Sequence, residues 1–185
     1  ECRSLGITLV ADMLHFGLPE WMHAGNPDAP FFQNPNFPEL FAEYAKVFAE
    51  RFPEVRYFTV VNEPFVTAHF SAKLGIWNEK LVGLGNNNSA FIRAICNIAK
   101  AAVLGREAIE GVRKKQHKPA PIFVQNESFE KAFAEAGSGR EAEAENFNLR
   151  RFAALDLIFG IYDSTMETFL AGQGISRDEY WWFMN

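Results

Sequence analysis

Cysteine is scarce in this chain, which contains only Cys2 and Cys96. Two cysteines supply neither a disulfide framework nor the clustered spacing of a zinc site. No apolar run is long enough to cross a bilayer, and the net charge of −5 comes without a basic stripe that could follow a nucleic-acid backbone. We therefore expect no membrane partner and no nucleic-acid partner.

Glycine-rich signatures are missing as well. No phosphate-binding or dinucleotide-binding glycine motif follows any of the apolar stretches. No cluster of metal-ligating residues is visible, so we expect neither a metal nor another cofactor. The chain opens at Glu1 without a methionine or a signal segment. We expect the natural protein to begin earlier, to end later and to be cytoplasmic.

Apolar and aromatic residues, by contrast, are abundant. Hydrophobic residues make up 48% of the 185 residues, and the chain holds 19 Phe and 4 Trp. This composition is sufficient to bury a core, and it suits a core that surrounds an aromatic-lined cleft. By length, residues 1–185 correspond to about one domain.

Three stretches have the composition of buried strands, because β-branched and aromatic residues dominate them. A segment with the helical spacing of apolar residues follows each stretch. This alternation predicts a parallel sheet with crossover helices, and long loops after the strands are typical of the active-site face of a (β/α)8 TIM barrel. The predicted strands are 5–15, 55–63 and 119–127, and the predicted helices are 37–52, 89–114 and one that starts near Arg140.

Capping and breaking residues define the ends of these elements. Asn36, Ser89 and Ser176 are expected helix N-caps, because their side chains can accept a hydrogen bond from a free backbone N–H. Pro64 is expected to stop the second strand, since it has no backbone donor. Two connections are long for structureless loops, which is typical of functional segments. These connections are 16–36 and 65–88.

Polar side chains stand where each predicted strand ends. They are His15 after the first strand, Asn62 and Glu63 after the second, and Asn126 and Glu127 after the third. Because the carboxyl ends of parallel strands meet at one rim, we expect these side chains to lie together. A carboxylic acid flanked by amides and a histidine can bind several hydroxyl groups and deliver a proton, which suits a sugar substrate.

Five blocks of the chain resemble glycoside hydrolase family 1, the β-glucosidase family, and they follow the family's order. FTVVNEPF at 58–65 resembles TLNEPW, and LHFGLPEW at 14–21 resembles YHWDLPQW. The NEP motif alone is weak, but five collinear blocks over nearly the whole chain are specific. The other three blocks are 39–52, 96–105 and 145–160.

The resemblance implies a retaining, double-displacement glycosidase with Glu63 as the general acid/base. Asn62 would bind the hydroxyl next to the anomeric carbon, and His15 would bind another ring hydroxyl. Asn126 would lie near the aglycone, with Glu127 beside it as a further substrate contact or as the partner of a nearby arginine. The chain would run from the third barrel strand to just before the sixth. The nucleophile carboxylate lies on the seventh strand in this family, so we expect the segment alone to be inactive.

Departures from the family pattern leave other hypotheses open. Phe16 and Gly17 replace Trp-Asp after the histidine, and Phe65 replaces the Trp after NEP. A catalytically inactive, carbohydrate-binding relative would keep the rim without the chemistry. A third alternative is an unrelated (β/α)8 enzyme such as a lyase. Under the glycosidase hypothesis the substrate is a β-glycoside.

Overall fold

The computed structural model describes residues 2–24, 31–77 and 88–185. Its sheet has three parallel strands in the order β1-β2-β3. Parallel neighbours need a crossover connection, and here each crossover runs through a helix, as the alternating sequence pattern predicted. The strands are β1 (Val10–Asp12), β2 (Tyr57–Thr59) and β3 (Ile122–Phe123).

These strands are much shorter than predicted. The predicted stretches 5–15, 55–63 and 119–127 contain β1, β2 and β3 respectively, but the rest of each stretch consists of turns, bends or irregular backbone outside the strands. A ladder forms only where a neighbouring backbone keeps register. Within the described residues, the outer edges of β1 and β3 have no partner strand, so their apolar composition alone does not extend the strands.

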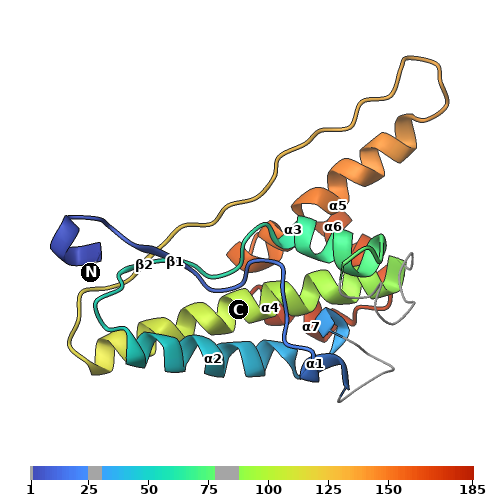
Figure 1. Ribbon diagram of the computed structural model, residues 1–185. Helices are drawn as coiled ribbons and strands as arrows, with labels where there is room; N and C mark the ends of the chain where they lie inside the picture. Colours follow the sequence, from blue (N-terminus) through green and yellow to red (C-terminus); the bar gives the residue numbers. More distant parts are fainter. Residues whose placement is uncertain (1, 25–30, 78–87) are drawn as a thin grey trace.

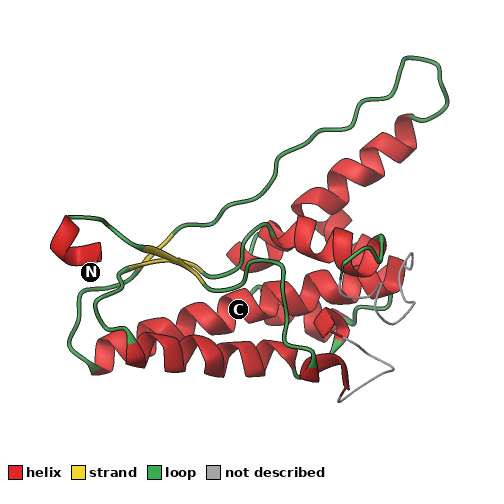
Figure 2. Cartoon of the chain, viewed as in Figure 1, coloured by secondary structure: helices red, strands yellow, loops and turns green. Residues whose placement is uncertain are grey.

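The two faces of the sheet differ in burial because successive side chains of a strand alternate between faces. Phe58 is 0% exposed, and its register partners are Ala11 on β1 and Phe123 on β3. This row faces the helices, which cover one side of the sheet (Figure 2). On the neighbouring row, Val10 is 47% exposed and Ile122 is also exposed. The helices therefore build the core against a single face.

Two long helices lie side by side along that face (Figure 1). They are α2 (Phe37–Arg51) and α4 (Asn88–Lys115). Gly105 of α4 permits their close approach, since a Cβ at this position would lie 2.9 Å from the Phe41 ring and 3.1 Å from Val60. Among the described helices, none is both long and apolar enough to cross a membrane.

The C-terminal end of α4 is fastened to the sheet by Arg113. Arg113 belongs to the basic last turn of α4, and its side chain is buried. Its guanidinium donates hydrogen bonds to the carbonyls of Pro53, Val55 and Pro119, the last at 2.8 Å. These carbonyls precede β2 and β3, so Arg113 fixes the points at which both strands begin.

The long connections contain helices that the sequence pattern did not predict. Pro64 begins α3 (Pro64–Ala68), so it starts a helix directly after the second strand segment, in a first-turn position where its missing N–H costs nothing. A π-helix, η3 (His69–Lys73), continues α3. Parts of the predicted loops, 25–30 and 78–87, lie outside the described residues. The other helices are η1 (Cys2–Leu5), α1 (Trp21–Ala24), η2 (Phe31–Gln33), α5 (Glu141–Phe159), α6 (Ser164–Gly172) and α7 (Arg177–Trp182).

The predicted caps have different outcomes. Ser176 caps α7 in a reciprocal capping box with Glu179, which confirms the prediction. Asn36 precedes α2 as predicted, but its backbone is helical (φ −88°, ψ −7°), and among the described residues its side chain makes no capping bond. The described helix α4 begins at Asn88, one residue before the predicted cap Ser89.

Candidate functional site

The ends of the three strands form one rim that backbone hydrogen bonds hold together. The N–H of Asn62 donates to the Leu14 carbonyl at 2.9 Å, which joins the segments after β2 and β1. The N–H of Glu63 donates to the Asn126 carbonyl at 3.3 Å, which joins the segments after β2 and β3. These bonds lie beyond the regular ladder and keep the three segments adjacent at the rim.

Two amides from neighbouring segments are bonded to each other at this rim. The Asn126 Nδ2 group donates to Asn62 Oδ1. Asn62 is 4% exposed, and its backbone carbonyl accepts a hydrogen bond from the buried Thr67 hydroxyl at 3.0 Å. Because an amide has one acceptor end and one donor end, this bond leaves the Asn62 nitrogen as the donor available to a ligand hydroxyl.

Glu63 occupies a strained turn between β2 and α3. Its backbone is left-handed (φ 43°, ψ 68°), a conformation that is uncommon for residues other than glycine. The Thr67 N–H donates to the Glu63 carbonyl at 2.9 Å and closes the first turn of α3. Strain of this kind persists only where the surrounding structure enforces it, and it concentrates at functional positions. Here it falls on the residue with the predicted acid/base carboxyl.

His15 lies just beyond β1 and pairs with Asp12, three residues before it. The His15 Nδ1 atom lies 2.8 Å from Asp12 Oδ2, and the His15 side chain is 61% exposed. A carboxylate at Nδ1 favours the tautomer with a proton on that nitrogen, which leaves Nε2 as the atom for a ligand. Within the described structure, no hydrogen bond joins His15 to the other four predicted site residues.

An aromatic row that the sequence did not predict continues from His15. The His15 and Phe16 ring centroids are 4.5 Å apart, and Phe16 lies 4.7 Å from Trp77. Trp77 in turn stacks on Phe70 at 4.9 Å. These residues come from two connections that are distant in sequence, so only the fold brings them together. Such rings offer an apolar surface beside the polar rim.

The Glu127 carboxylate is occupied by backbone donors. Glu127 Oε2 accepts from the Phe65 N–H at 2.7 Å, and Oε1 accepts from the Ser128 N–H at 3.0 Å. Burial raises the pKa of Glu127, and the nearby charge of Glu63 acts in the same direction, whereas the two N–H groups and Arg151 oppose it. The sequence provided the residue but gave no signal for its bond to Phe65.

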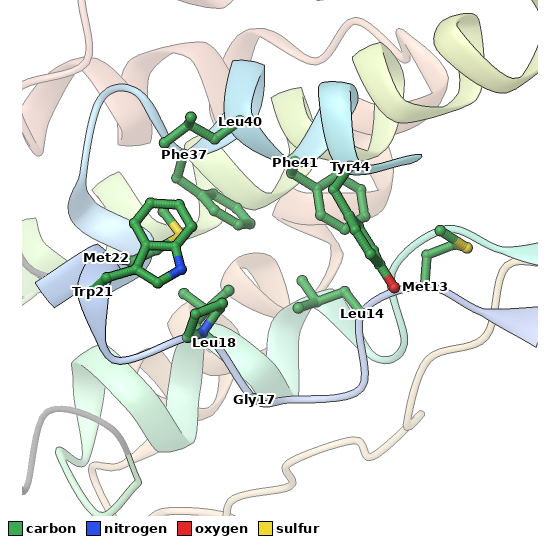
Figure 3. A pocket seen from close by; sticks show the side chains of 11 residues that line it. Met13, Leu14, Gly17, Leu18, Trp21, Met22, Phe37, Leu40, Phe41 and Tyr44 are labelled. Carbon is green, nitrogen blue, oxygen red and sulfur yellow. The ribbon is translucent and has the colours of Figure 1, made fainter. Parts of the chain in front are cut away.

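A mainly apolar pocket of about 340 Å³ lies between α2 and the segment that follows β1 (Figure 3). Leu14 and Leu18 form one wall, while Phe37, Phe41 and Tyr44 of α2 form the other. None of the five predicted site residues lines this pocket. This pocket is therefore separate from the predicted polar residues at the rim.

Parallel β/α units with an acid, two amides and a histidine beyond the strand ends have the arrangement of a segment of a (β/α)8 barrel. Across the described ranges, no group of three or more His, Cys, Asp or Glu residues is arranged to hold a metal ion. Glycosyl hydrolase family 1 matches residues 1–178. The chain therefore belongs to glycosyl hydrolase family 1, as the five collinear blocks predicted.

Solved structures share this fold at low sequence identity. A β-glucosidase from Exiguobacterium marinum matches with a TM-score of 0.74 and 18% identity, over 100% of this chain and 41% of that protein. Virulence factor SghA from Agrobacterium tumefaciens matches with a TM-score of 0.75 and 21% identity, over 100% and 39%. A β-glucosidase from Thermotoga maritima in complex with deoxynojirimycin matches with a TM-score of 0.71 and 19% identity, over 98% of this chain and 39% of that protein. The chain thus spans 39–41% of the length of these proteins. A comparison with curated proteins gave no match.

Proposed function

We propose that residues 1–185 are part of the catalytic domain of a retaining glycosidase, with Glu63 as its general acid/base. The observation that carries this proposal is the placement of Glu63, in a family 1 chain, on a strained turn beside the Asn62–Asn126 amide pair. The neighbours named as β-glucosidases support a β-glucoside as the substrate class. They share only the fold at this identity, so the site residues carry the chemical argument.

In the proposed reaction Glu63 gives its proton to the glycosidic oxygen while that bond breaks. A second carboxylate attacks the anomeric carbon and forms a glycosyl-enzyme ester, and Glu63 then takes a proton from the water that hydrolyses this ester. A retaining enzyme places the two carboxyls about 5 Å apart. As membership of this family implies, we assign the nucleophile to the seventh barrel strand, outside residues 1–185.

The remaining rim residues are proposed to bind the sugar. The side-chain nitrogen of Asn62 would donate to the hydroxyl next to the anomeric carbon. The Nε2 atom of His15 would bind another ring hydroxyl, while Asn126 would lie toward the aglycone. The Asn62–Asn126 hydrogen bond supports these roles because it fixes both amides before a ligand arrives.

The test is Glu63→Gln in the complete gene product, assayed with two β-glucosides that differ in leaving group. The amide keeps the shape of the side chain but cannot give up a proton as an acid. Hydrolysis of the poor leaving group should fall by about 10²–10⁴-fold, and the first step with a very good leaving group should fall far less. The control is Glu54→Gln, an exposed glutamate just before β2, which should retain full activity.

Equal losses with both substrates would contradict the acid role of Glu63. A wild-type protein that binds a glucoside in calorimetry but hydrolyses neither substrate would instead support a catalytically inactive, carbohydrate-binding relative.

A further inference from the structure

The first turn of α3 is capped from across the rim. Glu63 occupies the N-cap position of this helix, yet within the described residues its side chain makes no capping hydrogen bond. The Phe65 N–H, which has no partner inside the helix at this position, donates instead to Glu127 Oε2 at 2.7 Å. A carboxylate from the segment after β3 thus does what an N-cap side chain normally does for its own helix.

Arg151 contacts both residues that donate to Glu127. Its side chain is 1% exposed, and its guanidinium lies 4.6 Å from the centre of the Phe65 ring. It also donates to the Ser128 hydroxyl at 3.2 Å. Phe65 and Ser128 are the two residues whose N–H groups bind Glu127. The arginine therefore holds both donors in place, and its charge favours the ionised form of Glu127.

We propose that Glu127 is a positioning residue: its carboxylate caps α3, holds the left-handed turn at Glu63 and leaves the Glu63 carboxyl free for proton transfer. This inference rests on the function proposed for Glu63. Both carboxylate oxygens of Glu127 already accept hydrogen bonds from backbone N–H groups. A sugar hydroxyl would have to compete with these donors for the same oxygens. The positioning role replaces the sugar-contact role that the sequence suggested for this residue.

The proposal predicts a pH dependence of the cap. Among the described residues, the charged groups that act on Glu127 are Glu63 and Arg151, and Arg151 Nη1 lies 3.7 Å from Glu130 Oε2. His69 stacks on the Phe65 ring at 5.4 Å. Burial raises the pKa of Glu127. Proton uptake should therefore weaken the bond to Phe65 at a pH above the ordinary range of glutamic acid, and the full bond forms only above the raised pKa.

Kinetics of the complete gene product test the positioning role. Glu127→Ala removes both acceptors, so kcat should fall by about 10- to 100-fold with little change in KM, because the acid loses its geometry and no substrate contact is lost. Glu127→Gln keeps one amide oxygen for the Phe65 N–H and should recover part of that loss. The matched control is Glu135→Ala, an exposed glutamate of the same extended segment, which should leave kcat unchanged. A rise in KM at constant kcat, or no change at all, would overturn the proposal.

The Phe65 amide resonance, in complete gene product labelled with ¹⁵N-phenylalanine, tests the cap independently of activity. Its proton shift should titrate with Glu127 in the wild type, and this titration should vanish in Glu127→Gln. Any titration that persists in the variant comes from groups other than Glu127, such as His69, whose pKa burial lowers. A Phe65 shift that is the same in both proteins at every pH would overturn the proposal. If the wild type has no glycosidase activity, the function proposed for Glu63 fails, and this resonance still decides whether Glu127 holds the turn.

Discussion

The helical layer and the rim of this molecule are held by different forces. Where the helices meet the sheet, Phe58 of β2 packs between the rings of Phe48 and Phe123, and Gly105 lets α4 lie close to α2. At the rim, the contacts are hydrogen bonds between polar groups around the strained residue Glu63. Stability should therefore depend mainly on the layer, and the geometry for chemistry on the rim.

The largest effect on stability is expected from Phe58→Ala, in the core where β2 meets the helical layer. The Phe58 side chain is 0% exposed, so truncation removes a whole buried ring and leaves a cavity. We expect a loss of about 3–5 kcal/mol in the free energy of unfolding, measured by urea denaturation of the complete gene product. The matched control is Phe133→Ala, because Phe133 is 80% exposed in the extended segment 124–136. A loss of similar size at both positions would break the distinction between the layer and the surface.

The next effect tests how closely the two long helices approach. Gly105→Ala places a Cβ 2.9 Å from the Phe41 ring and 3.1 Å from Val60, so these side chains or the helices must shift. We expect a loss of about 1–3 kcal/mol in unfolding free energy from overpacking. Gly111→Ala on the same helix meets no atom within 4 Å in the described structure and should stabilise the protein by about 0.5–1 kcal/mol. The same sign of change at both glycines would contradict the close-packing argument.

The same division of forces explains which elements the sequence predicts. The ends of the predicted helices 37–52 and 89–114 agree with α2 and α4 to within one residue, because helical hydrogen bonds are local and their apolar spacing is visible in the sequence. The strand stretch 5–15 contains only Val10–Asp12 as a strand, because pairing depends on a neighbour that the stretch itself does not encode.

The candidate site was predictable to a similar extent. The strand-end rule placed the amides of Asn62 and Asn126 at one rim, and the structure bonds them to each other. The bond between Glu127 and Phe65 could not be predicted, because it exists only once β2 and β3 pair and α3 begins at Pro64. The pairing of His15 with Asp12 could have been predicted from the sequence, because the two residues are three positions apart on the same segment.

The smallest effect on stability is expected from His15→Ala. This variant tests whether a rim residue can matter for activity without contributing to stability. The His15 side chain is exposed and its bond to Asp12 is a surface pair, so the free energy of unfolding should change by less than about 0.5 kcal/mol. If Nε2 binds a ring hydroxyl more tightly in the transition state, kcat/KM for the β-glucoside should nevertheless fall by about tenfold, which corresponds to one hydrogen bond.

The control for His15 lies at the opposite end of the sheet. His117 is exposed beyond the end of α4, and its φ of 54° is tolerated by asparagine. His117→Asn should therefore change neither stability nor kcat/KM. If His15→Ala unfolds the protein, or leaves folded enzyme with normal kcat/KM, His15 belongs with the structural residues of the layer and not with the chemistry of the rim. A tenfold loss of kcat/KM in His15→Ala with an unchanged free energy of unfolding would show that His15 acts in function and adds almost nothing to packing.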